Sequence, residues 1–256
     1  MLRNLLLAAS CIVLSAVAAN PQRVPVLVEL FTSEGCSSCP PADRHLQQLD
    51  SQAIVLSEHV DYWDQLGWKD RFSSPAFTER QEVYTKEFGL DSPYTPQMVV
   101  DGVAQFTGGD TRRAAAEIEK AAGRPKAAIF LERIGAGVRV DIKGSPKEAD
   151  IWLALADNND STRVAGGENK GHTLTHVAVV RSIRKIGSLK RGGTFSRQVD
   201  LPSGSAGQRV VVFVQEAGQA RVLGAAMLLG AVALAASFLP ARRAVGMNPL
   251  DALRDE

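Results

Sequence analysis

The chain has 256 residues, of which 22% are charged and 45% hydrophobic, and its formal net charge is +1 at pH 7. This length accommodates one large domain or two modest ones. A nearly neutral balance gives no electrostatic basis for binding a polyanion, so nucleic acid is excluded as an expected partner.

Residues 1–19 are predicted to be a secretory signal peptide. Arg3 precedes an apolar run over residues 5–17, and residues 16–18 supply the A-x-A pattern of a cleavage site. The apolar run is short for a membrane span, although an uncleaved anchor stays an alternative. Export to the periplasm would remove Cys11 and leave two cysteines in a compartment where disulfides persist.

These two cysteines lie where a predicted strand passes into a predicted helix. Residues 26–31 have the length and composition of a short buried strand, and a helix opened by two prolines is expected over residues 40–49. Cys36 and Cys39 lie at the start of this helix, where free N–H groups and the positive end of the helix dipole favour a thiolate. A Cys-x-x-Cys pair in this setting indicates a thiol–disulfide redox site.

Two other interpretations of the cysteine pair stay open. One is half of a zinc site completed by histidines, since the chain has no second cysteine pair. The available histidines are His45, His59, His172 and His176. The other is an inert structural disulfide, although so short a loop constrains the unfolded chain little. His172 and His176 would share one face of a helix or a strand, but no carboxylate completes an obvious ligand set. We therefore predict no metal site and no cofactor.

Strands and helices alternate through the rest of the first half. The expected elements are a strand over 53–59, a long aromatic and acidic loop over 60–70, a helix over 75–88, a strand over 97–100, a return strand over 103–106 and a helix over 111–122. The order β-α-β-α-β-β-α predicts one compact α/β unit over residues 24–123.

The second half is predicted to be a β-rich domain over residues 126–218. Its strand candidates are 127–133, 137–142, 149–156, 174–183, 194–201 and 209–215. Short strands joined by glycine, serine and asparagine turns are typical of a β-sandwich.

Residues 222–239 are apolar apart from Ser237, and Arg242 and Arg243 follow them. A helix of this length measures about 27 Å, slightly less than a hydrocarbon core of about 30 Å. With an exported N-terminal part, the basic tail over residues 240–256 would lie in the cytoplasm, as the positive-inside rule prefers. We therefore expect a single membrane helix that anchors the protein in the inner membrane; a buried terminal helix or strand is the alternative.

Four motifs resemble a known family. They are GCSSCPPAD at 35–43, HVDYWDQLGWKD at 59–70, YTPQMVVDG at 94–102 and GENKGHTLTH at 167–176. Together they are similar to a family of exported bacterial thioredoxin-like proteins known as domain-of-unknown-function family 1223. The resemblance spans about residues 24–226. The fold class it implies is α/β: a thioredoxin-like domain, followed by a β-rich, sandwich-like domain and the C-terminal apolar helix.

The resemblance also implies a substrate-binding region beside the dithiol. Thr95-Pro96 matches a loop that holds a cis-proline, where the Thr95 backbone would pair with a bound peptide. Tyr62, Trp63 and Trp68 are expected to line the substrate groove, and packing in the core is the alternative for these three side chains. Two further acidic residues near the dithiol, Glu34 and Asp43, are expected to be surface charges. The motif residues Glu168 and Asn169 receive no assigned chemistry.

The expected activity is thiol–disulfide exchange with protein or small-molecule thiols and disulfides. Cys36, expected to be the more exposed cysteine, would be the nucleophile, and Cys39 would resolve the mixed disulfide and pair with Cys36 in the oxidised form. Glu29 would accept the proton of Cys39, and the alternative is that Glu29 faces solvent or an arginine partner. Two alternatives are a non-catalytic binding module with a structural Cys36–Cys39 disulfide, and a copper- or zinc-handling protein that uses both cysteines with His45 or His59.

The C-terminal segment resembles a different class of protein. Residues 225–256 are similar to the last membrane helix and cytoplasmic tail of MacB/FtsX-type transporter permeases. A single helix cannot form a transporter, so this resemblance implies a gene fusion or a junction artefact.

Overall fold

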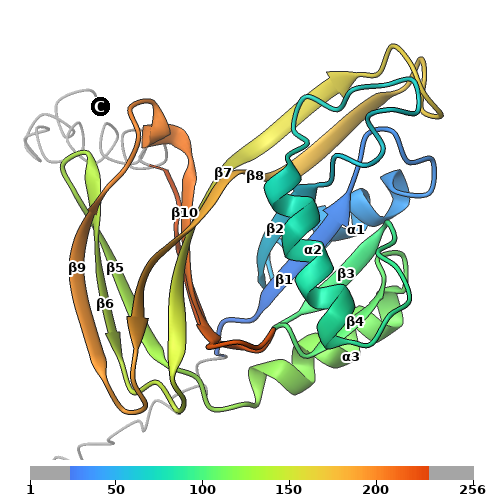
Figure 1. Cartoon of the computed structure of the whole chain (residues 1–256). Coiled ribbons are helices and arrows are strands. Elements are labelled where there is room, and N and C mark those ends of the chain that lie inside the picture. The colour runs from blue at the N-terminus through green and yellow to red at the C-terminus, as the bar shows by residue number, and fades with distance from the viewer. Residues whose placement is uncertain (1–23, 231–256) are drawn as a thin grey trace, which may run out of the picture.

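The structure, a computed structural model, describes residues 24–230 (Figure 1). Within these residues the chain forms three α-helices, eleven strands and one short 3₁₀-helix. The elements are β1 (Leu27–Thr32), α1 (Pro40–Leu49), β2 (Ile54–His59), α2 (Pro75–Glu87), β3 (Gln97–Val100), β4 (Ala104–Thr107), α3 (Thr111–Ala122), β5 (Ala128–Ile134), β6 (Gly137–Lys143), β7 (Ala149–Arg163), β8 (Thr173–Leu189), β9 (Thr194–Asp200), η1 (Ser205–Gly207), β10 (Arg209–Glu216) and β11 (Val222–Leu228). Most of these elements lie within one or two residues of their predicted positions.

Eight strands form one mixed sheet with the order β11-β10-β7-β8-β2-β1-β3-β4. Strands β1 and β2 are parallel, β2 and β8 are parallel, and the remaining neighbours are antiparallel. A smaller sheet with the order β5-β6-β9 packs against β7, β8 and β10 through a shared apolar core. The long β7–β8 hairpin therefore crosses the middle of the molecule, and Figure 1 shows it extending over the loops above α1 and α2.

The predicted fold class is wrong, because the elements assemble differently from the two predicted domains. The protein is not an α/β thioredoxin-like domain followed by a separate sandwich-like domain, because β2 pairs with β8 and one sheet includes strands from both halves. Every residue of β2 is buried, so its outer edge needs a partner for its backbone N–H and C=O groups. That partner is more than a hundred residues away, and no local sequence pattern identifies it.

The predicted C-terminal apolar helix is also wrong over its first part. Val222–Leu228 is strand β11, which pairs antiparallel with β10 at the edge of the large sheet. Gly224 suits this position, because a Cβ there would lie 2.8 Å from the Ala127 carbonyl oxygen. Between residues 24 and 230, no helix combines the length and apolar character needed to cross a bilayer. The signal peptide, Cys11, residues 231–239 and the basic tail over 240–256 lie outside the described residues.

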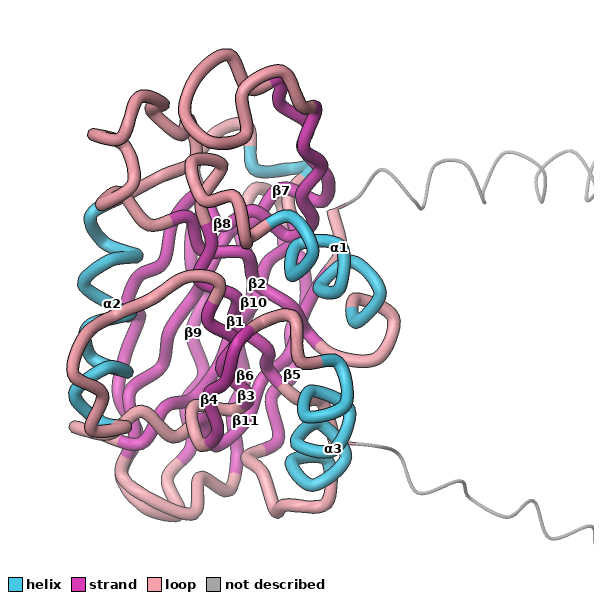
Figure 2. Tube along the Cα trace, turned by 90° about the vertical axis from the view of Figure 1, so that its right-hand side faces the viewer, coloured by secondary structure: helices cyan, strands magenta, loops and turns pink. Residues whose placement is uncertain are grey.

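The helices cover the large sheet on two sides, with α2 on one side and α1 and α3 on the other (Figure 2). Alternate residues of β1 consequently enter different cores. Val28 and Leu30 pack in the cluster that contains α1 and α3, whereas Leu27 and Phe31 pack in clusters with α2. By the same alternation Glu29 faces α2, and Thr32 faces α1.

Candidate functional site

Cys36 and Cys39 form a disulfide in the turn between β1 and α1. Cys39 is the N-cap residue of α1, and Pro40 occupies the first helical turn. Both cysteines are fully buried, at 0% exposure, whereas Ser37 and Ser38 between them are exposed. The expectation that Cys36 would be the more exposed cysteine is therefore wrong for this oxidised structure.

The disulfide is buried because a distant loop covers the turn that carries it. This cap loop comprises residues 164–172, at the tip of the β7–β8 hairpin. The Asn169 side-chain amide donates hydrogen bonds to the carbonyl oxygens of Glu34 and Cys36, each at 2.9 Å. The Ser37 backbone N–H donates to the Glu168 carboxylate at 2.9 Å. The pair Glu168-Asn169, to which the sequence assigned no chemistry, thus fastens the cap loop to the dithiol turn.

Two glycines allow the cap loop to approach the aromatic loop over residues 60–70. A Cβ on Gly166 would lie 2.3 Å from the Gly67 carbonyl oxygen. Gly167 has a φ of +67°, and a Cβ there would lie 3.0 Å from Trp68 Cβ. Larger residues at these positions would push the two loops apart. The pair Gly166-Gly167, of which Gly167 begins the GENKGHTLTH motif, was the sequence signal for this contact.

The predicted substrate-binding residues divide into two groups. Trp63 donates a hydrogen bond from Nε1 to Thr95 Oγ1 at 2.9 Å, and the Thr95–Pro96 peptide bond is cis. Trp63 also packs closely against Gly35, immediately before the disulfide. The structure therefore brings Trp63, Thr95 and Pro96 to the dithiol turn. Tyr62 instead donates from its hydroxyl to Gln81 on α2, and burial raises the pKa of Tyr62 to about 12.

A cluster of acid–base side chains lies next to the disulfide, on the α1 side of the sheet. Its members are Glu34, Asp43, His59, Asp70 and His176, all less than 5% exposed. Glu34 and Asp43 are thus not the surface charges expected from the sequence. Their neighbours on β2, β8 and the aromatic loop come from distant parts of the chain, so local sequence could not show their burial.

The charges within this acid–base cluster shift each other's pKa values. Burial raises the pKa of Asp43, against the opposing charges of His176 and His59. Burial alone would lower the pKa of His59, but the charge and hydrogen bond of Asp70 outweigh it and raise the pKa. Burial would likewise raise the pKa of Asp70, but His59 lowers it. His59 Nδ1 and Asp70 Oδ2 lie 2.6 Å apart, and these two side chains therefore form a buried ion pair.

The other histidines have separate surroundings. His45 Nδ1 is 3.0 Å from the Gly108 carbonyl oxygen, and His172 is exposed on the cap loop. Within the described residues, no group of three or more cysteine, histidine or carboxylate side chains is arranged to hold a metal ion.

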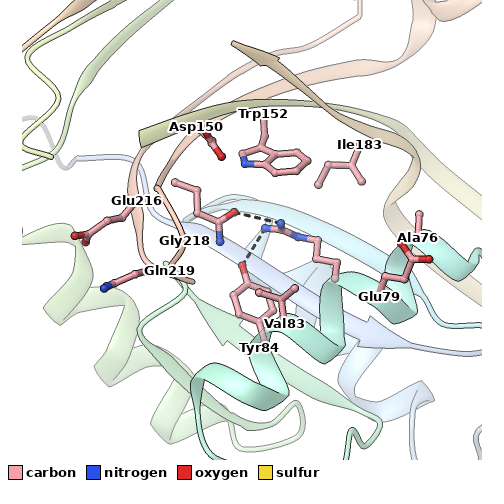
Figure 3. A pocket seen from close by; sticks show the side chains of 12 residues that line it. Ala76, Glu79, Val83, Tyr84, Asp150, Trp152, Ile183, Glu216, Gly218 and Gln219 are labelled. Atoms are coloured by element: carbon pink, nitrogen blue, oxygen red, sulfur yellow. Dashed lines mark hydrogen bonds between the residues drawn. The ribbon is translucent and has the colours of Figure 1, made fainter. Parts of the chain in front are cut away.

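The structure does not bring Glu29 to the dithiol. Glu29 lies on the α2 face of β1, where Arg80 Nε donates to its carboxylate at 2.6 Å and the Tyr84 hydroxyl donates to the other oxygen. Glu58 is buried beside them, and burial together with the charge of Glu29 raises its pKa well above the usual range. A cavity of about 490 Å³ lies next to Glu29 and Arg80, and Arg80 is one of the residues that line it. Figure 3 shows Trp152 on the wall of this cavity that lies across from Tyr84 and Val83.

The fold and this site define a class: a mixed β-sheet protein with a Cys-x-x-Cys disulfide at a helix N-terminus, covered by a hairpin from the other half of the chain. The chain belongs to the family described as Protein of unknown function (DUF1223), whose model matches residues 27–215. The resemblance read from the sequence motifs is confirmed at the level of this family.

Two solved structures are similar to this chain. The crystal structure of protein AGR_C_4864 from Agrobacterium tumefaciens shares 29% sequence identity and a TM-score of 0.71, over 83% of this chain and 97% of that chain. HBP35 of Porphyromonas gingivalis shares 15% identity and a TM-score of 0.54, over 81% of this chain and 76% of that chain, which shows a similarity of fold alone. No functionally curated protein matches the chain.

Asn169→Ala is expected to speed reduction of the Cys36–Cys39 disulfide by dithiothreitol about thirtyfold. The substitution removes two hydrogen bonds that hold the cap loop closed, each contributing about 1 kcal/mol, and about 1.4 kcal/mol corresponds to a tenfold change. Alkylation of free thiols at timed intervals measures the rate. Asn158→Ala is a matched control, because its amide also donates to a backbone carbonyl, that of Gly207 at 2.9 Å, but not in the cap loop. Equal rates in Asn169→Ala and the wild type would contradict the role of the cap.

Proposed function

We propose that this protein is an exported thiol–disulfide oxidoreductase whose reactive pair is Cys36 and Cys39. The observation that carries the proposal is the Cys36–Cys39 disulfide at the N-terminus of α1, beside a buried cluster of acid–base groups. The helix N-terminus favours a thiolate there, and the cluster offers groups that exchange protons.

The exchange proceeds through one mixed disulfide. In the reduced protein, the Cys36 thiolate attacks a substrate disulfide, forms a bond to one sulfur and releases the other as a thiolate. The Cys39 thiol then loses its proton, and its thiolate attacks the Cys36 sulfur and releases the second substrate thiolate. The net result is oxidation of the dithiol and reduction of the substrate disulfide, and the reverse sequence forms a disulfide in a substrate.

Substrate binding is proposed to involve the surface formed by Trp63, Thr95 and Pro96, together with Tyr62 behind it. The contact of Trp63 with Gly35 and its hydrogen bond to Thr95 support a binding surface next to the dithiol turn. Because both cysteines are buried, the cap loop has to move away before a substrate sulfur reaches Cys36.

The periplasm is the proposed location. Export rests on the signal-peptide pattern over residues 1–19, and an oxidising compartment suits a disulfide that cycles. The permease-like tail is interpreted as a fusion remnant without a part in this chemistry.

One observation favours a second candidate, the non-catalytic binding module. Both cysteines have 0% exposure, which also suits a structural disulfide that never meets a substrate. The two candidates differ in reduction potential, because structural disulfides usually lie below about −300 mV, whereas oxidoreductases lie between about −270 and −120 mV.

The deciding experiment equilibrates the mature protein in glutathione or dithiothreitol redox buffers and counts free thiols by alkylation. We expect a reduction potential within the oxidoreductase range, and catalysis of insulin reduction by dithiothreitol above the uncatalysed rate. A disulfide that stays oxidised at the potential of thioredoxin, about −270 mV, with no catalysis, would support the binding module instead.

A further inference from the structure

Four members of the buried acid–base cluster end in atoms without a hydrogen-bond partner in the described part of the chain. These atoms are both ring nitrogens of His176, Nε2 of His59, one carboxylate oxygen of Glu34 and one of Asp43. The atoms of His176, Glu34 and Asp43 form one arrangement. They face each other: His176 Nε2 lies 3.7 Å from Glu34 Oε1, and His176 Nδ1 lies 3.7 Å from Asp43 Oδ2. Buried polar atoms are normally paired, so this arrangement calls for a functional reason.

A metal ion does not provide that reason, because the two ring nitrogens face carboxylates on different sides of the imidazole. A proton does, because imidazole gains a proton on one nitrogen and releases one from the other. The geometry therefore places an acid–base group between two carboxylates.

Other groups pack around His176 as well. From β2, His59 packs against the His176 ring at 4.7 Å between centroids; its Nδ1 is bound to Asp70 of the aromatic loop, and its Nε2 has no hydrogen-bond partner in the described part of the chain. From β1, the Thr32 hydroxyl donates to Asp43 Oδ1 at 2.9 Å. The free oxygens of Asp43 and Glu34 are the atoms that lie 3.7 Å from the His176 ring nitrogens.

Asp43 connects this arrangement to the dithiol. Its backbone N–H donates to the Cys39 carbonyl oxygen at 3.0 Å, so it lies one helical turn after Cys39 and on the same face of α1. Both side chains are buried, and burial strengthens the Asp43 carboxylate as a base by raising its pKa.

His176 also borders a route to water. A surface cavity of about 390 Å³ is lined by His176 together with polar residues of α1, the loop before α2, and strands β7 and β8. Those residues are Gln47, Arg71, Asn159, Asp160, Ser161 and Thr175. This cavity is separate from the surface formed by Trp63 and Pro96, so a proton has an exit that a bound substrate does not block.

We propose that Asp43 and His176 form a proton relay for Cys39, a role that rests on the proposed function. When Cys39 resolves the mixed disulfide, its thiol proton passes to the Asp43 carboxylate, and Cys39 becomes the attacking thiolate. His176 accepts that proton on Nδ1 and releases one from Nε2 to the Glu34 carboxylate, which returns Asp43 to its ionised form. In the reverse reaction the same groups return the proton to Cys39.

The test follows the two phases in which the reduced full-length protein, carrying Cys11→Ser so that Cys36 and Cys39 are its only thiols, reacts with the aromatic disulfide DTNB. Attack by Cys36 releases the first coloured thiolate, and attack by Cys39 on the resulting mixed disulfide releases the second. At pH 7 we expect His176→Gln to slow the second phase about tenfold or more, while the first phase changes less than about twofold. Above about pH 9 the difference should disappear, because Cys39 then ionises without a relay.

His172→Gln is the matched control, since His172 is exposed four residues earlier, and both of its phases should equal those of the wild type. Asp43→Asn is a second, nearly isosteric variant for which we expect the same slow second phase. A second phase of wild-type rate in both variants, or one slowed equally at every pH, would overturn the relay while leaving the redox function in place. Absence of the first phase in the wild type would overturn the proposed function, and the relay with it.

Discussion

Cys39→Ser is expected to turn the protein into a trap for disulfide substrates. Cys36 in this variant still attacks a substrate and forms a mixed disulfide, but no second thiolate is present to release it. Catalysis of insulin reduction should fall to the uncatalysed rate, and a covalent adduct should accumulate. Non-reducing electrophoresis, with and without later addition of dithiothreitol, detects this adduct.

Two further variants are controls for this trapping experiment. Cys36→Ser should lose catalysis without forming an adduct, because the nucleophile is gone. Asn158→Ala should behave as the wild type, because its amide donates to the Gly207 carbonyl oxygen and not to the dithiol turn. No adduct in Cys39→Ser, or adducts in Cys36→Ser as well, would contradict the assignment of Cys36 as nucleophile.

Arg80→Met is expected to lower the free energy of unfolding by about 3–5 kcal/mol at pH 7. The Arg80 side chain is 10% exposed and lies 2.6 Å from Glu29 and 3.6 Å from Glu58, both of which are fully buried. Arg80 also donates to the Tyr84 hydroxyl at 2.9 Å. Without the guanidinium, the charge of Glu29 has no opposing charge in a buried site, while methionine keeps most of the packing volume.

The stability lost in Arg80→Met should be larger at pH 7 than at lower pH. Burial and the charge of Glu29 raise the pKa of Glu58, and Arg80 opposes them, so removing Arg80 raises the pKa of Glu58 further in the folded state. A carboxyl group whose pKa is higher in the folded than in the unfolded state destabilises the folded protein at every pH above its unfolded pKa. The free energy of unfolding lost in Arg80→Met should therefore become smaller as the pH falls toward about 4, the unfolded pKa of a carboxyl group. Urea unfolding at pH 7 and pH 5 measures both effects.

A surface ion pair serves as the control for Arg80→Met. Arg181 lies 3.6 Å from Asp157, with both side chains partly exposed, so Arg181→Met should change the free energy of unfolding by less than about 1 kcal/mol. Adding Glu29→Gln to Arg80→Met should restore part of the lost stability. A loss below about 1 kcal/mol in Arg80→Met would show that Arg80 does not balance the buried carboxylates.

The candidate site combines segments that are distant in the chain. Asn169 reaches Glu34 across 135 positions, and Ser37 reaches Glu168 across 131. The β7–β8 hairpin carries both cap residues and His176, so one element supplies the cover of the disulfide and the central residue of the proposed relay. This arrangement depends on the pairing of β2 with β8, which anchors the hairpin beside α1.

The sequence by itself determined the individual elements and the Cys-x-x-Cys pair at the start of α1. Hydrophobic periodicity, proline at the first helical turn and glycine at turns act over a few residues, so they located α1 at Pro40–Leu49 and α3 at Thr111–Ala122. Four long motifs were sufficient to identify the family.

Only the tertiary structure decided which strands pair and which side chains meet. The apolar run from Val222 became a strand because β10 offered a free edge. The alternation along β1 was visible in the sequence, but which face receives α1 was not, and this places Glu29 with Arg80 instead of near Cys39. Glu34 and Asp43 are buried because His176 of β8 packs beside them. Such contacts depend on long-range strand pairing, whereas sequence patterns record only the preferences of neighbouring residues.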